Sequence, residues 1–243
     1  MVLPLFEPGF RSAGFTFHTV NPGALVITSG QLIACDALAD ADEAVPFTRT
    51  VPPGQYPVIL SIAVDARGQR LVAGAMLQFS TRPVHTWELA LTAHDLAEPD
   101  DDGAPPGFAV DAALGAFMDA DALGRLHALE PSGDFYMRFF DTPLTLNGGD
   151  WALFQPDPHH PANLAAFSTG GSDGVFPCAF ALDLAGHPVA LVTHFGLIDP
   201  RGGWAQRLWR WLWGQGVRLL GWVRRVRAGQ AIRRGTTPLN LGS

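Results

Sequence analysis

Hydrophobic and polar residues alternate along much of the first half of the chain, and this alternation predicts β-strands. The pattern is clearest over residues 56–63 and 70–79, which are separated by the turn sequence Asp65-Ala66-Arg67-Gly68. Turns that recur about every eight to twelve residues are typical of a β-sandwich or a curved antiparallel sheet. We therefore expect the first half of the chain to form such a sheet.

Two further pairs of apolar runs predict hairpins. Residues 24–28 and 31–35 flank Ser29-Gly30, which is a turn signal. Residues 175–182 and 188–195 flank a Leu-Ala-Gly sequence of the same kind. The pattern therefore predicts that each run pairs with its neighbour in the chain.

The middle of the chain has a different composition. Residues 98–107 are acidic and then proline-rich, which predicts a solvated loop. Residues 112–129 are rich in alanine and predict a helix, with Asp119 or Asp121 near its N-cap. We expect an α+β fold that is mainly antiparallel β, with this short central helix.

Residues 200–243 differ from the rest in both charge and pattern. They hold nine Arg and no acidic residue, a net charge of +9, whereas residues 1–199 hold seven Arg and all 23 acidic residues, a net charge of −16. Five of the seven Trp lie within residues 204–234, where apolar positions recur every three or four residues. We expect two parts, a β-rich domain over 1–199 and an added C-terminal amphipathic helical tail over 200–243.

The basic residues, the cysteines and the apolar runs indicate the source and the cellular location of the protein. All sixteen basic residues are Arg, which a GC-rich bacterial genome would explain. Cys35 and Cys178 lie inside apolar runs without ligand spacing, so we predict buried free thiols. The first residues lack a basic segment followed by an apolar one, so we expect no secretory signal. No stretch of eighteen uncharged apolar residues occurs, so we expect no conventional membrane-spanning helix. We expect a cytoplasmic protein, peripheral at the inner membrane face if the tail binds lipid.

Short motifs along residues 24–198 resemble the uncharacterised DUF4241 family. In chain order they are Ser29-Gly30 with Ala34-Cys35-Asp36, Pro46-Phe47, Val51-Pro52-Pro53-Gly54-Gln55-Tyr56-Pro57-Val58, Trp87-Glu88-Leu89-Ala90, Val110-Asp111-Ala112-Ala113 with Phe117-Met118-Asp119, and the region from Phe167 to Phe195. The chain departs from the family pattern at Gly171-Ser172, at Phe176, at Ala113, where the family has Gly, and at His194, where it has Asp. The resemblance implies an architecture and site candidates, and it names no activity.

The acidic residues on these motifs are Glu88, Asp111, Asp119 and Asp173. Carboxylates that converge from separate strands could hold Ca²⁺ or Mg²⁺, or act as a general acid and base. The alternative is that Asp111 and Asp173 fix turns through bonds to the backbone. Both interpretations are open at this stage.

Ser168 and His194 complete the candidate polar cluster. With Asp173, and with Ser172 as an alternative serine, they could be arranged as a hydrolase triad, but the chain has no G-x-S-x-G motif. His194 lies in an apolar run, which favours a core or interface histidine over a ligand.

The tail has two interpretations. A Trp/Leu face opposite an Arg face suits an anionic membrane surface over residues 204–234, and it equally suits packing on the acidic body. Nucleic acid is disfavoured, because an acidic body repels phosphate. The residues expected to form this membrane or partner surface are Trp204, Arg207, Trp211, Arg218, Trp222 and Arg225.

Two function classes follow from these features. The first is a non-enzymatic binding or protein-interaction protein, of inhibitor or immunity type, with a protein partner and no cofactor. The second is a metal-assisted hydrolase that uses Glu88, Asp111, Asp119 and Asp173 with a divalent cation.

Overall fold

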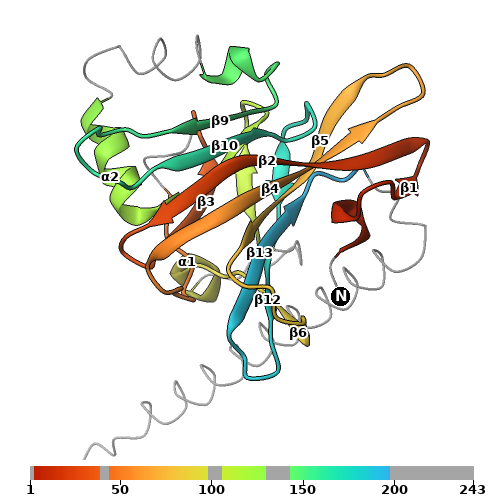
Figure 1. Cartoon of the computed structure of the whole chain (residues 1–243). Coiled ribbons are helices and arrows are strands. Elements are labelled where there is room, and N and C mark those ends of the chain that lie inside the picture. The colour runs from red at the N-terminus through yellow and green to blue at the C-terminus, as the bar shows by residue number, and fades with distance from the viewer. Residues whose placement is uncertain (1–2, 39–43, 98–105, 130–142, 198–243) are drawn as a thin grey trace, which may run out of the picture.

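The computed structural model describes residues 3–38, 44–97, 106–129 and 143–197, which form three antiparallel sheets (Figure 1). The large sheet has seven strands, in the spatial order β1 (Arg11–Ser12), β2 (Phe15–Ile27), β4 (Gly54–Val64), β5 (Arg70–Gln78), β13 (Pro188–His194), β12 (Cys178–Leu182) and β6 (Thr86–Leu89). The small sheet has the order β3 (Leu32–Asp36), β8 (Leu114–Asp119), β10 (Leu164–Ser168) and β9 (Trp151–Phe154). A third pair joins β7 (Phe108–Val110) to β11 (Gly174–Phe176).

The large sheet curls into a half-barrel. Its longest strands, β2 and β4, pair along most of their length, with a register shift between Val20 and Gly23. A second shift lies between Ser61 and Ile62, where β4 pairs with β5. Bulges of this kind bend a strand and increase its twist, so they favour the curled shape.

The main core fills the space between the large and small sheets. From the small sheet, Phe117 and Phe167 pack edge to face, with ring centroids 4.9 Å apart. Leu60, Leu77 and Phe180 contribute to the same cluster from the large sheet. Burial of these large side chains is the main stabilising contribution to this arrangement, at roughly 1.5–3 kcal/mol per side chain.

Helix α2 (Ala120–Leu129) covers the other face of the small sheet. Its buried residues, Ala122 and Leu126, are four apart and therefore share a helix face. They join a second cluster with Ile33 and Met118. A further short helix, α1 (Ala93–Ala97), follows β6, and the 3₁₀ helix η1 (Pro4–Phe6) lies near the start of the chain.

The local strand predictions are confirmed where neighbouring segments pair. β4 pairs with β5, and β12 with β13, in antiparallel register. The fold is mainly antiparallel β, as expected, and the described residues include two short α-helices where one was predicted. Cys35 and Cys178 are buried thiols that form no disulfide, also as predicted.

The predicted hairpin at Ser29-Gly30 is wrong. The two runs belong to different sheets, because β2 pairs with β4 and β3 pairs with β8. Gly30 has a positive φ of 80°, and a Cβ there would meet the carbonyl oxygen of Val51 at 2.7 Å. The turn therefore carries the chain from one sheet to the other instead of folding it back on itself.

The predicted helix over 112–129 begins too early. Residues 114–119 form strand β8, and the helix begins at Ala120. All six residues of β8 are buried, since the strand has a packed layer on both faces. Such a run shows no alternation, so periodicity cannot distinguish it from a buried helix. Asp119 does accept the backbone N–H of Asp121 at 3.0 Å, as expected near an N-cap.

Candidate functional site

The turn between β7 and β8, residues 111–113, is where three of the motif segments meet. Asp36, at the end of β3, is fully buried. Its Oδ2 atom accepts hydrogen bonds from the backbone N–H groups of Asp111 and Ala112, at 2.8 Å each. Its Oδ1 atom accepts the N–H of Leu38 at 2.7 Å. One carboxylate therefore holds its own loop and a turn some 75 residues further along the chain.

The same turn is held from its other side by the Gly170–Gly174 loop. Asp173 Oδ1 accepts the N–H of Ala113 at 3.1 Å, and the carbonyl of Ala113 accepts the N–H of Thr169 at 3.1 Å. Ala113 has a φ of 51°, in the left-handed region that favours glycine. This conformation explains why a Gly is expected at this position, and it means that Ala113 carries backbone strain.

A pocket of about 410 Å³ opens beside this turn. Five family-motif residues line it, from β3, the segment after β3 and the end of β6, namely Ala34, Cys35, Asp36, Phe47 and Ala90. Residues 107–109 and Cys178 also line it. We refer to this feature as the Asp36 pocket; its volume suits one or two partner side chains or a small ligand.

Asp36, Thr92 and Asp95, which line the Asp36 pocket, form hydrogen bonds within the fold. Asp95 Oδ2 accepts both the N–H and the hydroxyl of Thr92 at 2.7 Å, and the N–H of Asp95 donates to Thr92 Oγ1, which is a capping arrangement at the start of α1. Burial raises the pKa of the Cys178 thiol, which keeps it protonated and disfavours a nucleophilic role. His94 lines the pocket as an exposed side chain. The arrangement suits binding of an apolar group.

Asp119 lies at the opposite end of β8 from the 111–113 turn. It is fully buried and accepts hydrogen bonds from the N–H of Ser29 at 3.1 Å, from the Ser29 hydroxyl at 2.8 Å and from the Thr28 hydroxyl at 3.0 Å. Two motifs that are distant in sequence, Ser29-Gly30 and Phe117-Met118-Asp119, therefore meet here. The hydrogen bonds to Asp119 hold Thr28 and Ser29 where the chain passes from the large sheet to the small sheet.

Glu88 is an exposed residue of β6 that pairs with Arg49. The guanidinium contacts both carboxylate oxygens, at 3.1 Å and 2.7 Å. Arg49 also lies over the ring of Phe180, 5.9 Å from its centroid. The contact ties the segment after Phe47 to the edge of the large sheet.

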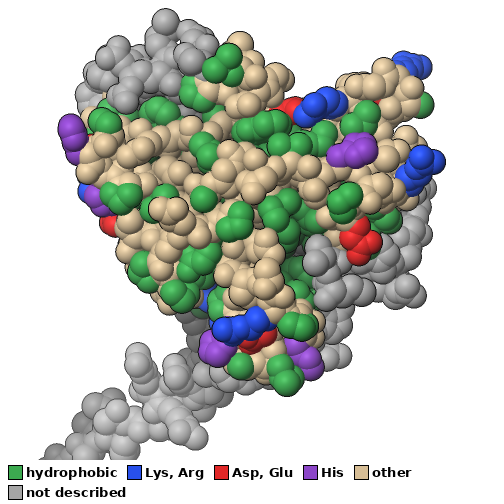
Figure 2. Space-filling view, in the orientation of Figure 1, with side chains coloured by type: hydrophobic (Ala, Val, Ile, Leu, Met, Phe, Trp, Pro, Cys, Tyr) green, Lys and Arg blue, Asp and Glu red, His purple; other side chains and the backbone are tan. Residues whose placement is uncertain are grey.

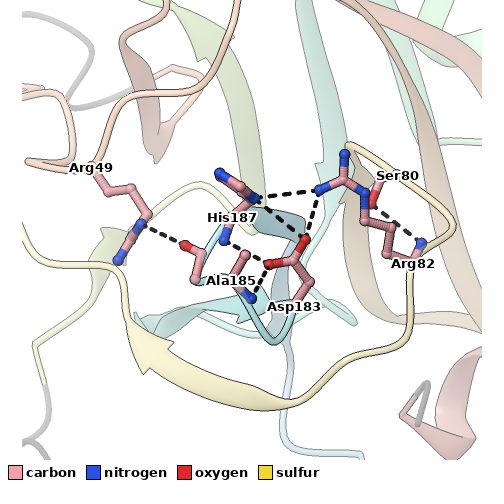
Figure 3. Close-up of polar contacts among 7 residues, drawn as sticks. Arg49, Ser80, Arg82, Asp183, Ala185 and His187 are labelled. Carbon is pink, nitrogen blue, oxygen red and sulfur yellow. Dashed lines mark hydrogen bonds and ion pairs between the residues drawn. The ribbon is translucent and has the colours of Figure 1, made fainter.

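The tip of the β12–β13 hairpin carries a further polar network, shown in Figure 3. Asp183 accepts the N–H groups of Ala185 and His187 at 2.9 Å each, and it forms an ion pair with Arg82 at 2.7 Å. The hydrogen bond from Arg82 and the backbone bonds lower the pKa of Asp183 to about 2. Arg49 reaches the carbonyl of Gly186 at 3.4 Å. Acidic, basic and histidine side chains lie close together at this tip of the molecule (Figure 2).

Ser168 and His194 each end a strand, and the two strands belong to different sheets. Ser168 ends β10, and its N–H donates to the carbonyl of Asp150 at 2.9 Å. His194 ends β13, and its Nδ1 atom accepts the N–H of Gly196 at 3.2 Å. Burial lowers the pKa of His194 to about 4, so its ring is neutral at pH 7. The environment matches the core histidine favoured by the sequence.

The four acidic candidates are distributed over three places. Asp111 and Asp173 meet at one turn, Asp119 lies at the far end of a strand about 17 Å long, and Glu88 pairs with Arg49. Within the described ranges, no group of three or more His, Cys, Asp or Glu residues has a geometry that could hold a metal ion.

The predicted membrane or partner surface of the tail, Trp204 to Arg225, lies outside the described residues. Within the part of the chain that the structure does describe, no helix is both long and apolar enough to span a bilayer.

Asp36, Asp183 and Arg82 were not among the candidate site residues. Two signals for them were present in the sequence. Asp36 ends the Ala34-Cys35-Asp36 motif, and Asp183 is an acidic residue directly after an apolar strand. A carboxylate that follows a buried strand is well placed to accept backbone N–H groups of a turn.

The fold and site define a mainly antiparallel β protein with a pocket where its sequence motifs converge. The chain belongs to the family described as Protein of unknown function (DUF4241), whose model matches residues 25–193. No curated protein and no solved structure matches the chain.

Proposed function

We propose that this chain is a binding protein, of inhibitor or immunity type, that captures a protein partner at the Asp36 pocket. The observation that carries the proposal is the convergence of the motif segments on this pocket, which is lined by Ala34, Phe47, Ala90 and Phe108. An open, apolar cavity with a formed rim is typical of a site that receives a side chain from a partner.

The roles of the motif carboxylates support the same proposal. Asp36 and Asp173 hold the turn beside the pocket, and Asp119 holds the crossing between sheets. A carboxylate that accepts several backbone N–H groups is an anchor for the main chain. Asp36 and Asp173 thus shape the rim of a binding surface, and Asp119 stabilises the fold behind it; neither role needs a reacting group.

The charge of the chain favours a basic contact surface on the partner. Residues 1–199 hold seven Arg against 23 acidic residues. Long-range attraction between surfaces of opposite charge increases the rate of association and excludes acidic competitors. We infer a basic protein partner with an exposed apolar side chain at its centre.

The test compares substitutions of two exposed apolar residues. Val45, 42% exposed, lines the pocket, and Leu146, 78% exposed, lies before β9 and does not line it. Proteins captured from a bacterial lysate by the wild-type chain should be lost with Val45→Arg and retained with Leu146→Arg. The dissociation constant for each purified candidate should then rise at least tenfold with Val45→Arg. Equal capture by all three proteins would contradict binding at the pocket.

A hydrolase screen separates this proposal from the metal-assisted enzyme. We expect no turnover that depends on added Mg²⁺ or Ca²⁺. Cation-dependent activity that is lost with Asp111→Ala and Asp173→Ala, while Asp157→Ala retains it, would replace binding with catalysis.

A further inference from the structure

The outer face of the large sheet carries an apolar groove of about 310 Å³. Its floor is formed by strands β5, β12 and β13 through Met76, Ala181, Ala190 and Val192. One wall is formed by Leu3 and Phe6, near η1, and the other by residues 80–84 with Trp87. We call this feature the outer groove.

The floor of the outer groove is shaped to receive large side chains. Two of its residues are alanines, Ala181 and Ala190, and small residues leave a depression between larger neighbours. The groove belongs to the apolar cluster of the outer face, which also includes Phe17 and Val189. An apolar depression of this kind favours a bulky apolar side chain over water.

The described part of the chain ends against this same cluster. Leu197 packs on the outer-face cluster, together with Val84 and Trp87. The next tryptophan in the sequence is Trp204, seven residues later. Seven extended residues span at most about 25 Å, so Trp204 is within reach of the outer groove.

The C-terminal segment and the outer groove are also complementary in composition and charge. Residues 200–243 hold nine Arg and no acidic residue. At the groove, Arg82 is already paired with Asp183, and the exposed carboxylate of Glu7 follows η1 directly. The apolar positions Trp204, Leu208 and Trp211 recur at helical spacing, which would place them on one face.

We propose that the outer groove is the docking site for the C-terminal segment of the same chain, with the Trp204, Leu208 and Trp211 face seated on Ala181 and Ala190. This inference is independent of the binding function of the Asp36 pocket, because the two cavities have no lining residue in common. The docked segment covers apolar surface on both partners, which is the driving force for the contact.

Crosslinking in the full chain tests the proposal. Thr81 is an exposed polar residue on the groove wall, and Ala205 adjoins Trp204. A short bismaleimide should join Thr81→Cys to Ala205→Cys within one chain. Leu146→Cys, at an exposed position before β9, replaces Thr81→Cys in the matched control and should give at least fivefold less product. The wild-type chain, whose Cys35 and Cys178 are buried, sets the background.

A second variant distinguishes a specific contact through the tryptophans from proximity that results only from the covalent connection of the chain. Addition of Trp204→Ala and Trp211→Ala to the Thr81/Ala205 pair should reduce the product at least threefold, because these side chains carry the contact. An undiminished yield would overturn the proposal, as would a product formed between two chains. Absence of the crosslink together with co-sedimentation of the full chain on phosphatidylglycerol vesicles would assign the tail to a membrane surface instead.

Discussion

The carboxylate of Asp36 accepts the backbone N–H of Asp111 at 2.8 Å, across 75 positions of sequence. The bond joins the end of β3 to the turn that precedes β8, and these two strands are neighbours in the small sheet. The same oxygen also accepts the N–H of Ala112. A charged acceptor with several backbone donors is a strong local anchor, so the shape of the Asp36 pocket depends on it.

Removal of this anchor should destabilise the protein. Asp36 is fully buried, and Asp36→Ala leaves the N–H groups of Leu38, Asp111 and Ala112 without their acceptor. We expect a loss of about 3 kcal/mol in the free energy of unfolding, measured in urea. Asp65 caps the β4–β5 turn through exposed bonds to Arg67 and Gln69. Because water can replace that carboxylate, Asp65→Ala should cost about 1 kcal/mol or less. Equal losses would contradict the anchor role.

A glycine at position 113 should stabilise the fold. Ala113 has a φ of 51°, which costs an L-residue about 1–2 kcal/mol relative to glycine. The greater entropy of glycine in the unfolded chain offsets part of this gain. We therefore expect Ala113→Gly to raise the free energy of unfolding by about 0.5–1 kcal/mol.

Ala112→Gly is the matched control for position 113. The structure gives Ala112 no positive φ, so the entropic cost acts alone and the variant should lose about 0.5–1 kcal/mol. Thermal unfolding should show a higher Tm for Ala113→Gly and a lower Tm for Ala112→Gly than for the wild type. Shifts of the same sign would exclude backbone strain at Ala113.

Asp119 should be far more sensitive to substitution than its neighbour Asp121. Asp119 is buried and accepts the Ser29 N–H, whereas Asp121 is exposed and accepts the Thr28 hydroxyl at 2.6 Å. We expect Asp119→Ala to cost about 3 kcal/mol and Asp121→Ala less than about 1 kcal/mol, by urea unfolding. Similar costs for the two variants would show that burial does not set the importance of Asp119.

His194 should make the protein less stable as the pH falls below its ordinary pKa. Burial lowers the folded-state pKa from 6.5 to about 4, so the unfolded chain binds the proton more readily between these values. The fold therefore keeps its full stability above pH 6.5. As the pH falls, protonation of the unfolded chain lowers the free energy of unfolding, by about 3 kcal/mol at pH 4. His194→Gln should flatten this part of the pH profile, while His85→Gln, at an exposed position, should retain it.

The ionisation of Asp183 should affect the stability of the fold at lower pH than that of His194. Its pKa is lowered from 3.8 to about 2, first by the bond from Arg82 and then by the N–H of His187. A depressed carboxyl pKa stabilises the fold above pH 3.8, and that stabilisation is lost as the pH falls toward 2. The Tm difference between wild type and Arg82→Gln should therefore shrink over this range. Arg67→Gln, at the exposed β4–β5 turn, should show a constant difference.

The sequence by itself determined the features that depend on near neighbours. The pairs β4–β5 and β12–β13 follow from alternation on either side of a turn, because both strands and their connection lie within one stretch of chain. The burial of Cys35 and Cys178 follows from the apolar runs around them. The opposite charges of residues 1–199 and 200–243 are a property of composition.

The tertiary structure alone decided which distant segments meet. Ser29-Gly30 resembles a hairpin turn, yet bonds from Asp119 hold it as a crossing between sheets. β8 resembles the start of a helix, and its pairing with β3 and β10 makes it a strand. Asp111 and Asp173 come together while Glu88 and Asp119 lie elsewhere. Periodicity encodes the environment of a residue along its own element, whereas contacts across 60–90 positions depend on how the sheets pack.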